Sequence, residues 1–139
     1  MFRGNKSIND MSRDGDLAGI QEKVRRGKDL NKKDEKGRTA VELACENGHL
    51  DVVVFLEKNG AMPSTWSMLS IVDIAAKGDL VGVEYKIMHK ANLNQVEDMR
   101  NNTALMLASR KGYQSIVNLL LQEGANKDAK NIDGYTALM

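Results

Sequence analysis

The feature that most constrains the fold of this 139-residue chain is that it repeats itself along its length. Segments 34–48 and 98–112 share the pattern Asp-x-x-Gly/Asn-x-Thr-Ala-Val/Leu-x-Leu-Ala-x-x-x-Gly, and residues 133–138 repeat part of it. Thr39 and Thr103 are 64 positions apart, and the threonine of the third segment follows after a further 33. A fixed period of this size is typical of arrays of small units that stack on one another.

A further unit must lie between the first two segments, because 64 is about twice 33. Residues 70–87 supply it, and they resemble residues 7–24 closely at an offset of 63. We therefore expect a single array over residues 1–139. Its units are about 1–33, 34–66, 67–97 and 98–130, followed by a truncated fifth unit at 131–139.

Each unit is predicted to be a turn followed by two short helices. Thr39 and Glu42 have the spacing of a capping box, which begins a helix, and Ser7 and Ser70 begin weaker versions of it. Glycines seven to nine residues later are placed to end the first helix, and apolar residues at spacings of three and four mark the second helix. Helices this short are marginal alone, so stacking must stabilise them.

These patterns resemble the ankyrin repeat, whose signature is Thr-Pro-Leu-His-x-Ala at a period of 33. The resemblance is strong at 34–61 and 98–126, moderate at 7–31 and weak at 65–94. It implies an all-α, ankyrin-repeat solenoid of helix-turn-helix units with projecting β-turn or hairpin fingers. The proline and histidine of the signature are missing throughout, and loss of the histidine predicts a less rigid array.

The resemblance also implies a binding surface, since partners of this family usually lie on the concave face made by the fingers and first helices. We therefore expect a non-enzymatic protein-protein interaction module or scaffold whose partner is a protein, with an acidic protein as one candidate. The alternative is a regulatory or targeting segment of a larger enzyme, for example a kinase, with its catalytic domain outside this chain. The candidate contact residues are Lys36, Arg38, Glu46, Asn47, Trp66, Arg100, Asn102, Arg110 and Lys111.

The third unit departs from the pattern in its turn. Only nine residues separate Gly60 from Ser70, against eleven between Gly27 and Thr39, and Met-Pro-Ser-Thr-Trp-Ser-Met replaces the Asp-x-x-Gly signal. We expect this shortened turn to twist or interrupt the stack. Trp66 either fills the gap left by the turn or stands exposed as an interface anchor.

No catalytic, cofactor or metal site is predicted. His49 and His89 lack a cysteine or carboxylate at metal-ligand spacing. Cys45 occupies a small first-helix position and is expected to be a buried space filler. The glycines follow the repeat rather than clustering before a helix as they do in phosphate-binding loops.

Charge is nearly balanced overall, with 20 Lys and Arg against 19 Asp and Glu. This balance argues against a general nucleic-acid binder. Residues 23–38 nevertheless hold eight basic side chains against three acidic ones. This stretch either steers an acidic protein, nucleic acid or phosphoinositide toward the first turn, or it is a solvated edge of the stack.

The longest apolar run, residues 52–56, is far too short to span a bilayer, and no secretory signal is seen. We expect an intracellular, cytoplasmic monomer, with the nucleus as a further possible location. The sequence stops one turn into a predicted helix. We expect either a fragment of a longer protein or an end that pairs with another molecule.

Overall fold

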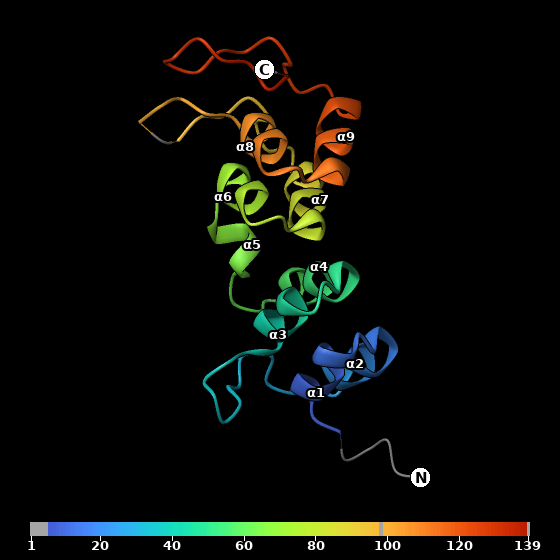
Figure 1. Cartoon of the computed structure of the whole chain (residues 1–139). Coiled ribbons are helices and arrows are strands. Elements are labelled where there is room, and N and C mark those ends of the chain that lie inside the picture. The colour runs from blue at the N-terminus through green and yellow to red at the C-terminus, as the bar shows by residue number, and fades with distance from the viewer. Residues whose placement is uncertain (1–5, 98, 139) are drawn as a thin grey trace. The chain divides into compact units, whose positions relative to one another are not determined.

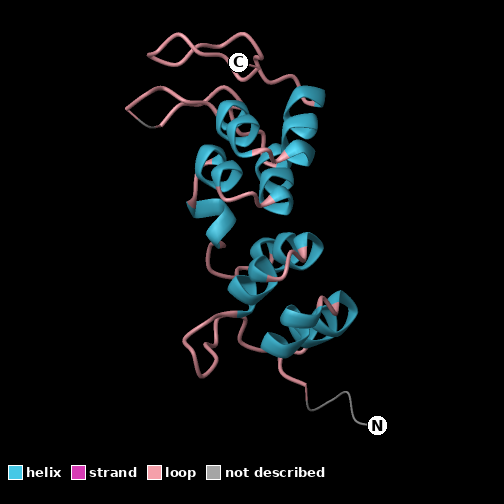
Figure 2. Cartoon of the chain, viewed as in Figure 1, coloured by secondary structure: helices cyan, strands magenta, loops and turns pink. Residues whose placement is uncertain are grey.

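The computed structural model describes residues 6–97 and 99–138, and in these ranges it contains helices and loops but no strand (Figures 1 and 2). The chain divides into two compact units, Met1–Met68 and Leu69–Met139. The described helices are α1 (Ile8–Asp14), α2 (Leu17–Arg25), α3 (Ala40–Glu46), α4 (Leu50–Lys58), α5 (Thr65–Met68), α6 (Ile71–Ala76), α7 (Leu80–Met88), α8 (Ala104–Lys111) and α9 (Gln114–Gln122).

The N-terminal unit contains two antiparallel helix pairs, α1 with α2 and α3 with α4, and the short helix α5. α1 packs on α3, the first helices of their pairs, and α2 contacts α4. Ile20, Leu43 and Leu56 are fully buried between them. Removal of these side chains from water supplies the stability that such short helices lack by themselves.

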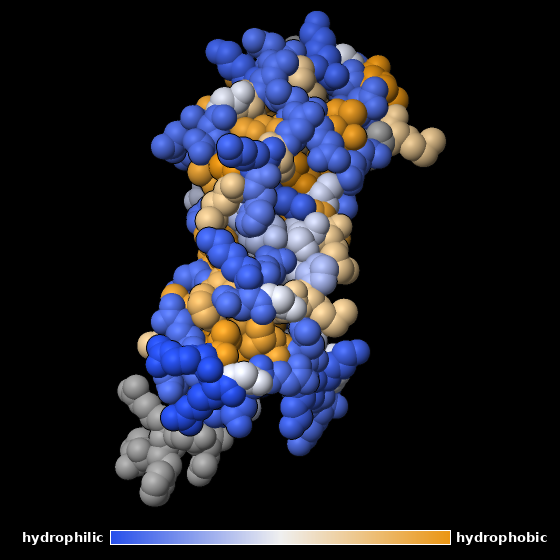
Figure 3. Space-filling model, turned by 180° about the vertical axis from the view of Figure 1, so that it is seen from behind, coloured by the Kyte–Doolittle hydropathy of each residue, from blue (hydrophilic) through white to orange (hydrophobic). Residues whose placement is uncertain are grey.

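The C-terminal unit repeats this arrangement. α6 packs on α8, and α7 contacts α9. Ile74, Leu105 and Leu120 are its fully buried counterparts. Figure 3 shows the surface from behind. Hydrophilic side chains cover much of each unit, and hydrophobic side chains are visible among the hydrophilic ones.

The first helices begin where the sequence predicted. Thr39 Oγ1 accepts a hydrogen bond from the Glu42 backbone N–H at 3.4 Å, and the Glu42 carboxylate accepts one from the Thr39 N–H at 3.3 Å. Ser7 and Ser70 cap α1 and α6 in the same way but without the reciprocal bond. The capping box therefore marks a true helix start.

Two glycines that follow first helices lie close against the aromatic ring of a residue in the next helix pair. Gly15 and Gly78 have φ angles of 79° and 76°. A Cβ on Gly15 would lie 2.7 Å from the His49 ring, and one on Gly78 would lie 2.9 Å from the Tyr113 ring. These positions need glycine for its positive φ and also for its lack of a side chain.

Three loops project from the helices and form the expected fingers: the first at 28–38, the second at 91–102 and the third at 126–136 (Figure 1). In the first finger, Asp34 Oδ1 accepts from the backbone N–H groups of Lys36 and Arg38 at 2.9 and 2.8 Å. The backbone N–H of Asp34 also donates to the Arg38 carbonyl at 2.8 Å. In the third finger, Asn131 makes the same set of bonds. Side-chain turns of this kind fix the shape of the first and third fingers.

The irregular third turn forms the short helix α5 in place of a finger. Ser64 caps it by accepting from the Ser67 N–H at 3.1 Å, and Trp66 is 2% exposed. α5 packs on α3, and the Cys45 thiol lies against Ser64 and the backbone of Trp66. Of the two alternatives for Trp66, the structure thus supports the first: it fills space in the N-terminal unit and is not an exposed interface anchor.

Changing Gly78 to Ala should destabilise the protein more than changing Gly112 to Ala. The two glycines have φ angles of 76° and 77°, so the backbone strain is the same, but nothing lies within 4 Å of a Cβ on Gly112. Displacing the Tyr113 ring should cost about 1 to 3 kcal/mol beyond that strain. Urea unfolding of both variants measures the difference, and equal losses would show that Tyr113 does not press on Gly78.

The first finger should weaken in acid. The backbone N–H of Arg38 and, to a lesser degree, its guanidinium lower the pKa of Asp34. A lowered pKa stabilises the folded state above the ordinary value of about 4, and this contribution disappears as the pH falls through the folded pKa. In urea unfolding, the stability advantage of the wild type over Asp34→Asn, which keeps the acceptor found at Asn131, should shrink below about pH 4. An advantage independent of pH would contradict the assignment.

Cys45 should be unreactive until the protein unfolds. Burial raises the pKa of its thiol to about 11. About one molecule in a thousand then carries the reactive thiolate near pH 8, against about a quarter for an ordinary cysteine. Colorimetric labelling with a soluble aromatic disulfide should therefore be slow in buffer and fast in denaturant. Labelling at the same rate in both would show that the thiol is accessible.

Candidate partner-binding surfaces

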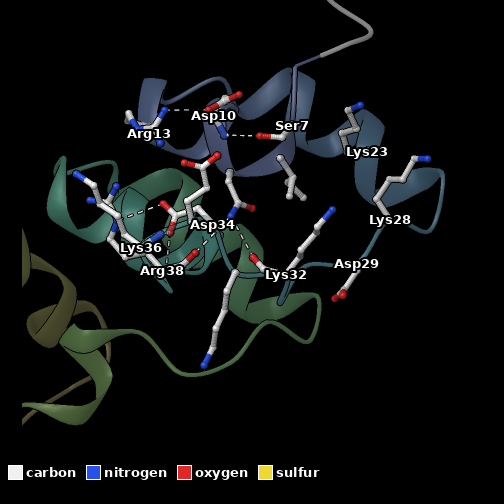
Figure 4. A pocket seen from close by; sticks show the side chains of 14 residues that line it. Ser7, Asp10, Arg13, Lys23, Lys28, Asp29, Lys32, Asp34, Lys36 and Arg38 are labelled. Carbon is white, nitrogen blue, oxygen red and sulfur yellow. Dashed lines mark hydrogen bonds and ion pairs between the residues drawn. The ribbon is translucent and has the colours of Figure 1, made fainter.

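The N-terminal unit has a hollow of about 930 Å³ where the first finger faces α1, here called the basic hollow (Figure 4). Its lining comes from α1 and its cap Ser7, from Lys23 on α2 and from the first finger. The lining residues are Ser7, Ile8, Asn9, Asp10, Arg13, Lys23, Lys28, Asp29, Lys32, Lys33, Asp34, Glu35, Lys36 and Arg38.

Asn9 holds the first finger in place. It is 7% exposed, and its side-chain amide donates to the backbone carbonyls of Lys32 at 3.0 Å and Arg38 at 3.4 Å. One helix residue therefore ties down both sides of the finger. Asn31 fixes the base of the same loop, because its Oδ1 accepts from the Met62 N–H at 2.8 Å.

The basic hollow has an excess of positive charge, with seven basic and four acidic side chains in its lining. Three of the four acidic side chains already bind a neighbouring group. Asp10 pairs with Arg13 at 2.9 Å, and Asp34 pairs with Arg38 at 3.2 Å. Asp29 accepts a hydrogen bond from a backbone N–H. Lysines of the first finger are not neutralised in this way. Within the described ranges, four of them make no side-chain hydrogen bond or ion pair: Lys28, Lys32, Lys33 and Lys36.

The C-terminal unit has a second, smaller hollow of about 400 Å³ between α8 and the third finger. Its lining includes the basic residues Arg100 and Arg110 and also Asp133 and Tyr135. Arg100 pairs with Asp133 at 2.9 Å, so its charge is already balanced. The second and third fingers are joined by a hydrogen bond from the backbone N–H of Ile132 to the Arg100 carbonyl at 2.9 Å.

Four of the sequence-predicted contact residues line these hollows, Lys36 and Arg38 in the first and Arg100 and Arg110 in the second. Their expected role in binding is untested by the fold. Glu46 is exposed and pairs with Arg38 at 3.0 Å.

Three other predicted contacts have structural roles. Asn47 is exposed, but its amide donates to the Leu43 carbonyl at 2.8 Å. The Lys111 ammonium donates to the Ala76 carbonyl at 2.8 Å and so links α8 to α6. Asn102 is only 2% exposed, and its Oδ1 accepts from Asn131 at 3.1 Å, so its side chain holds the third finger.

The residues that sequence reasoning missed are the asparagines that hold the fingers. Asn94 Oδ1 accepts from the Asn126 N–H at 2.8 Å, as Asn31 does from Met62. Asn31 and Asn94 are 63 positions apart, the same offset as the twin segments 7–24 and 70–87. That shared offset was the available signal for a bond from each of these asparagines to the turn of the following unit.

In the described ranges, no group of three or more His, Cys, Asp or Glu side chains is placed to hold a metal ion. Among the described helices, none has the length and apolar character needed to cross a bilayer.

Comparison with known families gives two matches. The family model for three copies of the ankyrin repeat matches residues 71–139, and the model for a single ankyrin repeat matches residues 36–64. Together they reach into both units and leave residues 1–35 and 65–70 unmatched.

Curated relatives agree with this result. The chain is 30% identical to a transient receptor potential cation channel subfamily A member 1 homologue of Caenorhabditis elegans over 81% of its length, and 33% identical to ankyrin repeat domain-containing protein 63 of Mus musculus over 70%. It is 31% identical over 92% of its length to the ankyrin repeat and KH domain-containing protein mask-1 of C. elegans. These matches span 9%, 26% and 5% of the three relatives. With its paired helices, projecting fingers and matched repeats, the chain belongs to the ankyrin repeat family.

Proposed function

We propose that this chain is a non-enzymatic protein-protein interaction module that binds its partner with the fingers and first helices. Ankyrin repeats are generic protein-protein interaction modules, and their domains are typically non-catalytic. The proposal treats residues 1–139 as a single array and places the partner inside the cell.

The observation that carries the proposal is that each unit has a hollow where a finger meets a first helix. Buried Asn9 fixes the first finger, and the Arg100 carbonyl and Asn94 fix the third. Surfaces that are already ordered lose little conformational entropy when a partner binds. Both hollows are therefore suited to binding a folded protein or a peptide with useful affinity.

A second candidate role is that of a regulatory or targeting segment within a longer protein. It is favoured by the small share of the relatives that the matches span. The length of the natural reading frame distinguishes the two roles. A catalytic domain in the same frame supports the second role, and a frame that holds ankyrin repeats alone supports the first.

Site-specific photo-crosslinking tests the proposed surface. A photoreactive phenylalanine analogue at Lys36 or Arg110 should crosslink a discrete partner in an extract of the cells that express the protein. The same analogue at Gln21 or Asn118, which are exposed on the second helices α2 and α9, should not. Crosslinks of equal yield from all four positions, or from the second helices alone, would contradict the proposal.

A further inference from the structure

The basic hollow differs from the second hollow in how its charges are balanced. Arg100 in the second hollow faces Asp133 at 2.9 Å. The basic hollow, by contrast, has more basic than acidic side chains in its lining. Two of its acids, Asp10 and Asp34, already pair with arginines of the same lining. The four finger lysines have no such partner among the described residues. Their attraction for an external anion is therefore not offset locally.

The lysines also lie on a backbone that is fixed. Asn9 bonds to the carbonyls of Lys32 and Arg38, and Asp34 closes the tip of the finger. Figure 4 shows Lys23, Lys28 and Lys32 along one side of the hollow and Lys36 and Arg38 on the other. Positive groups are thus presented on two sides of a preformed hollow, an arrangement that suits a narrow ligand.

The acids at the hollow select among anionic ligands. Asp29 and Glu35 lie in the same lining as the lysines, and the chain as a whole carries a net charge of only +1. A nucleic acid strand has a charge at every phosphate and would meet these carboxylates as well as the lysines. A peptide can place its carboxylates at the lysines and neutral residues at Asp29 and Glu35.

We propose that the basic hollow binds an acidic peptide segment of a protein partner through Lys28, Lys32, Lys33 and Lys36. This inference rests on the proposed function and deepens it by assigning one ligand class to one of the two hollows. Electrostatic attraction of this kind accelerates association and weakens with added salt.

An NMR titration of the whole chain tests the proposal, with a peptide of alternating glutamate and alanine as the probe. A peptide with lysine in place of each glutamate is the control. The acidic probe should shift backbone amide signals of residues 28–38 more than those of the second and third fingers. The basic peptide should leave residues 28–38 unchanged, and added salt should weaken binding of the acidic probe.

A matched pair of variants distinguishes the effect of the basic hollow on binding from the effect of the net charge of the chain. Changing Lys28, Lys32 and Lys33 to Glu should reduce affinity for the acidic probe by about ten-fold or more, because several ion pairs are lost together. Changing three exposed lysines elsewhere gives the same net charge and should alter affinity less than about two-fold. These control positions are Lys58, Lys77 and Lys90, which are exposed and lie outside the fingers and the first helices. The spectra of both variants report whether each is folded.

Several results would overturn the inference. They are the absence of any shift at 28–38 with the acidic probe, equal loss in both triple variants, and tighter binding to single-stranded RNA or to phosphoinositide vesicles than to the acidic probe. Failure of the inference is distinguishable from failure of the proposed function. If crosslinking from Arg110 captures a partner while the acidic probe does not bind, the module role stands and only the assignment of the basic hollow falls.

Discussion

Contact between first helices is the interaction on which the rest of the structure depends. α1 and α6 have seven and six residues, and helices of that length do not persist in water by themselves. Each is stabilised because α3 or α8 buries one of its faces. The fingers in turn depend on these contacts, since Asn9 reaches the first finger only from an α1 that is held in place.

Local chemistry made much of the fold predictable from the sequence. The capping box at Thr39 and Glu42 involves residues three apart, so spacing alone reveals it. The first-helix glycines were predictable for the same reason, with Gly15 and Gly112 ending α1 and α8 in the left-handed conformation. Lys90 follows α7 at the position where Gly27, Gly60 and Gly124 follow the other second helices, and it adopts a positive φ of 58°.

The candidate surface was less predictable because long-range contacts build it. Nothing in the neighbourhood of Asn9 reveals that its amide reaches carbonyls 23 and 29 positions away. Burial of Trp66 depends on α5 packing onto α3, and burial of Asn102 depends on the third finger reaching it. The positions lining the hollows were found where the repeat pattern identified exposed turns, as at Lys36 and Arg100.

The first finger is tied to α1 through main-chain carbonyls, those of residues 32 and 38, and not through their side chains. Every amino acid supplies the same carbonyl, so substitution at either position leaves this anchor intact. The scaffold can therefore keep its geometry while the chemical character of the hollow drifts from basic to neutral or acidic. New recognition specificities are then accessible to relatives of this chain through single substitutions that leave this anchor in place.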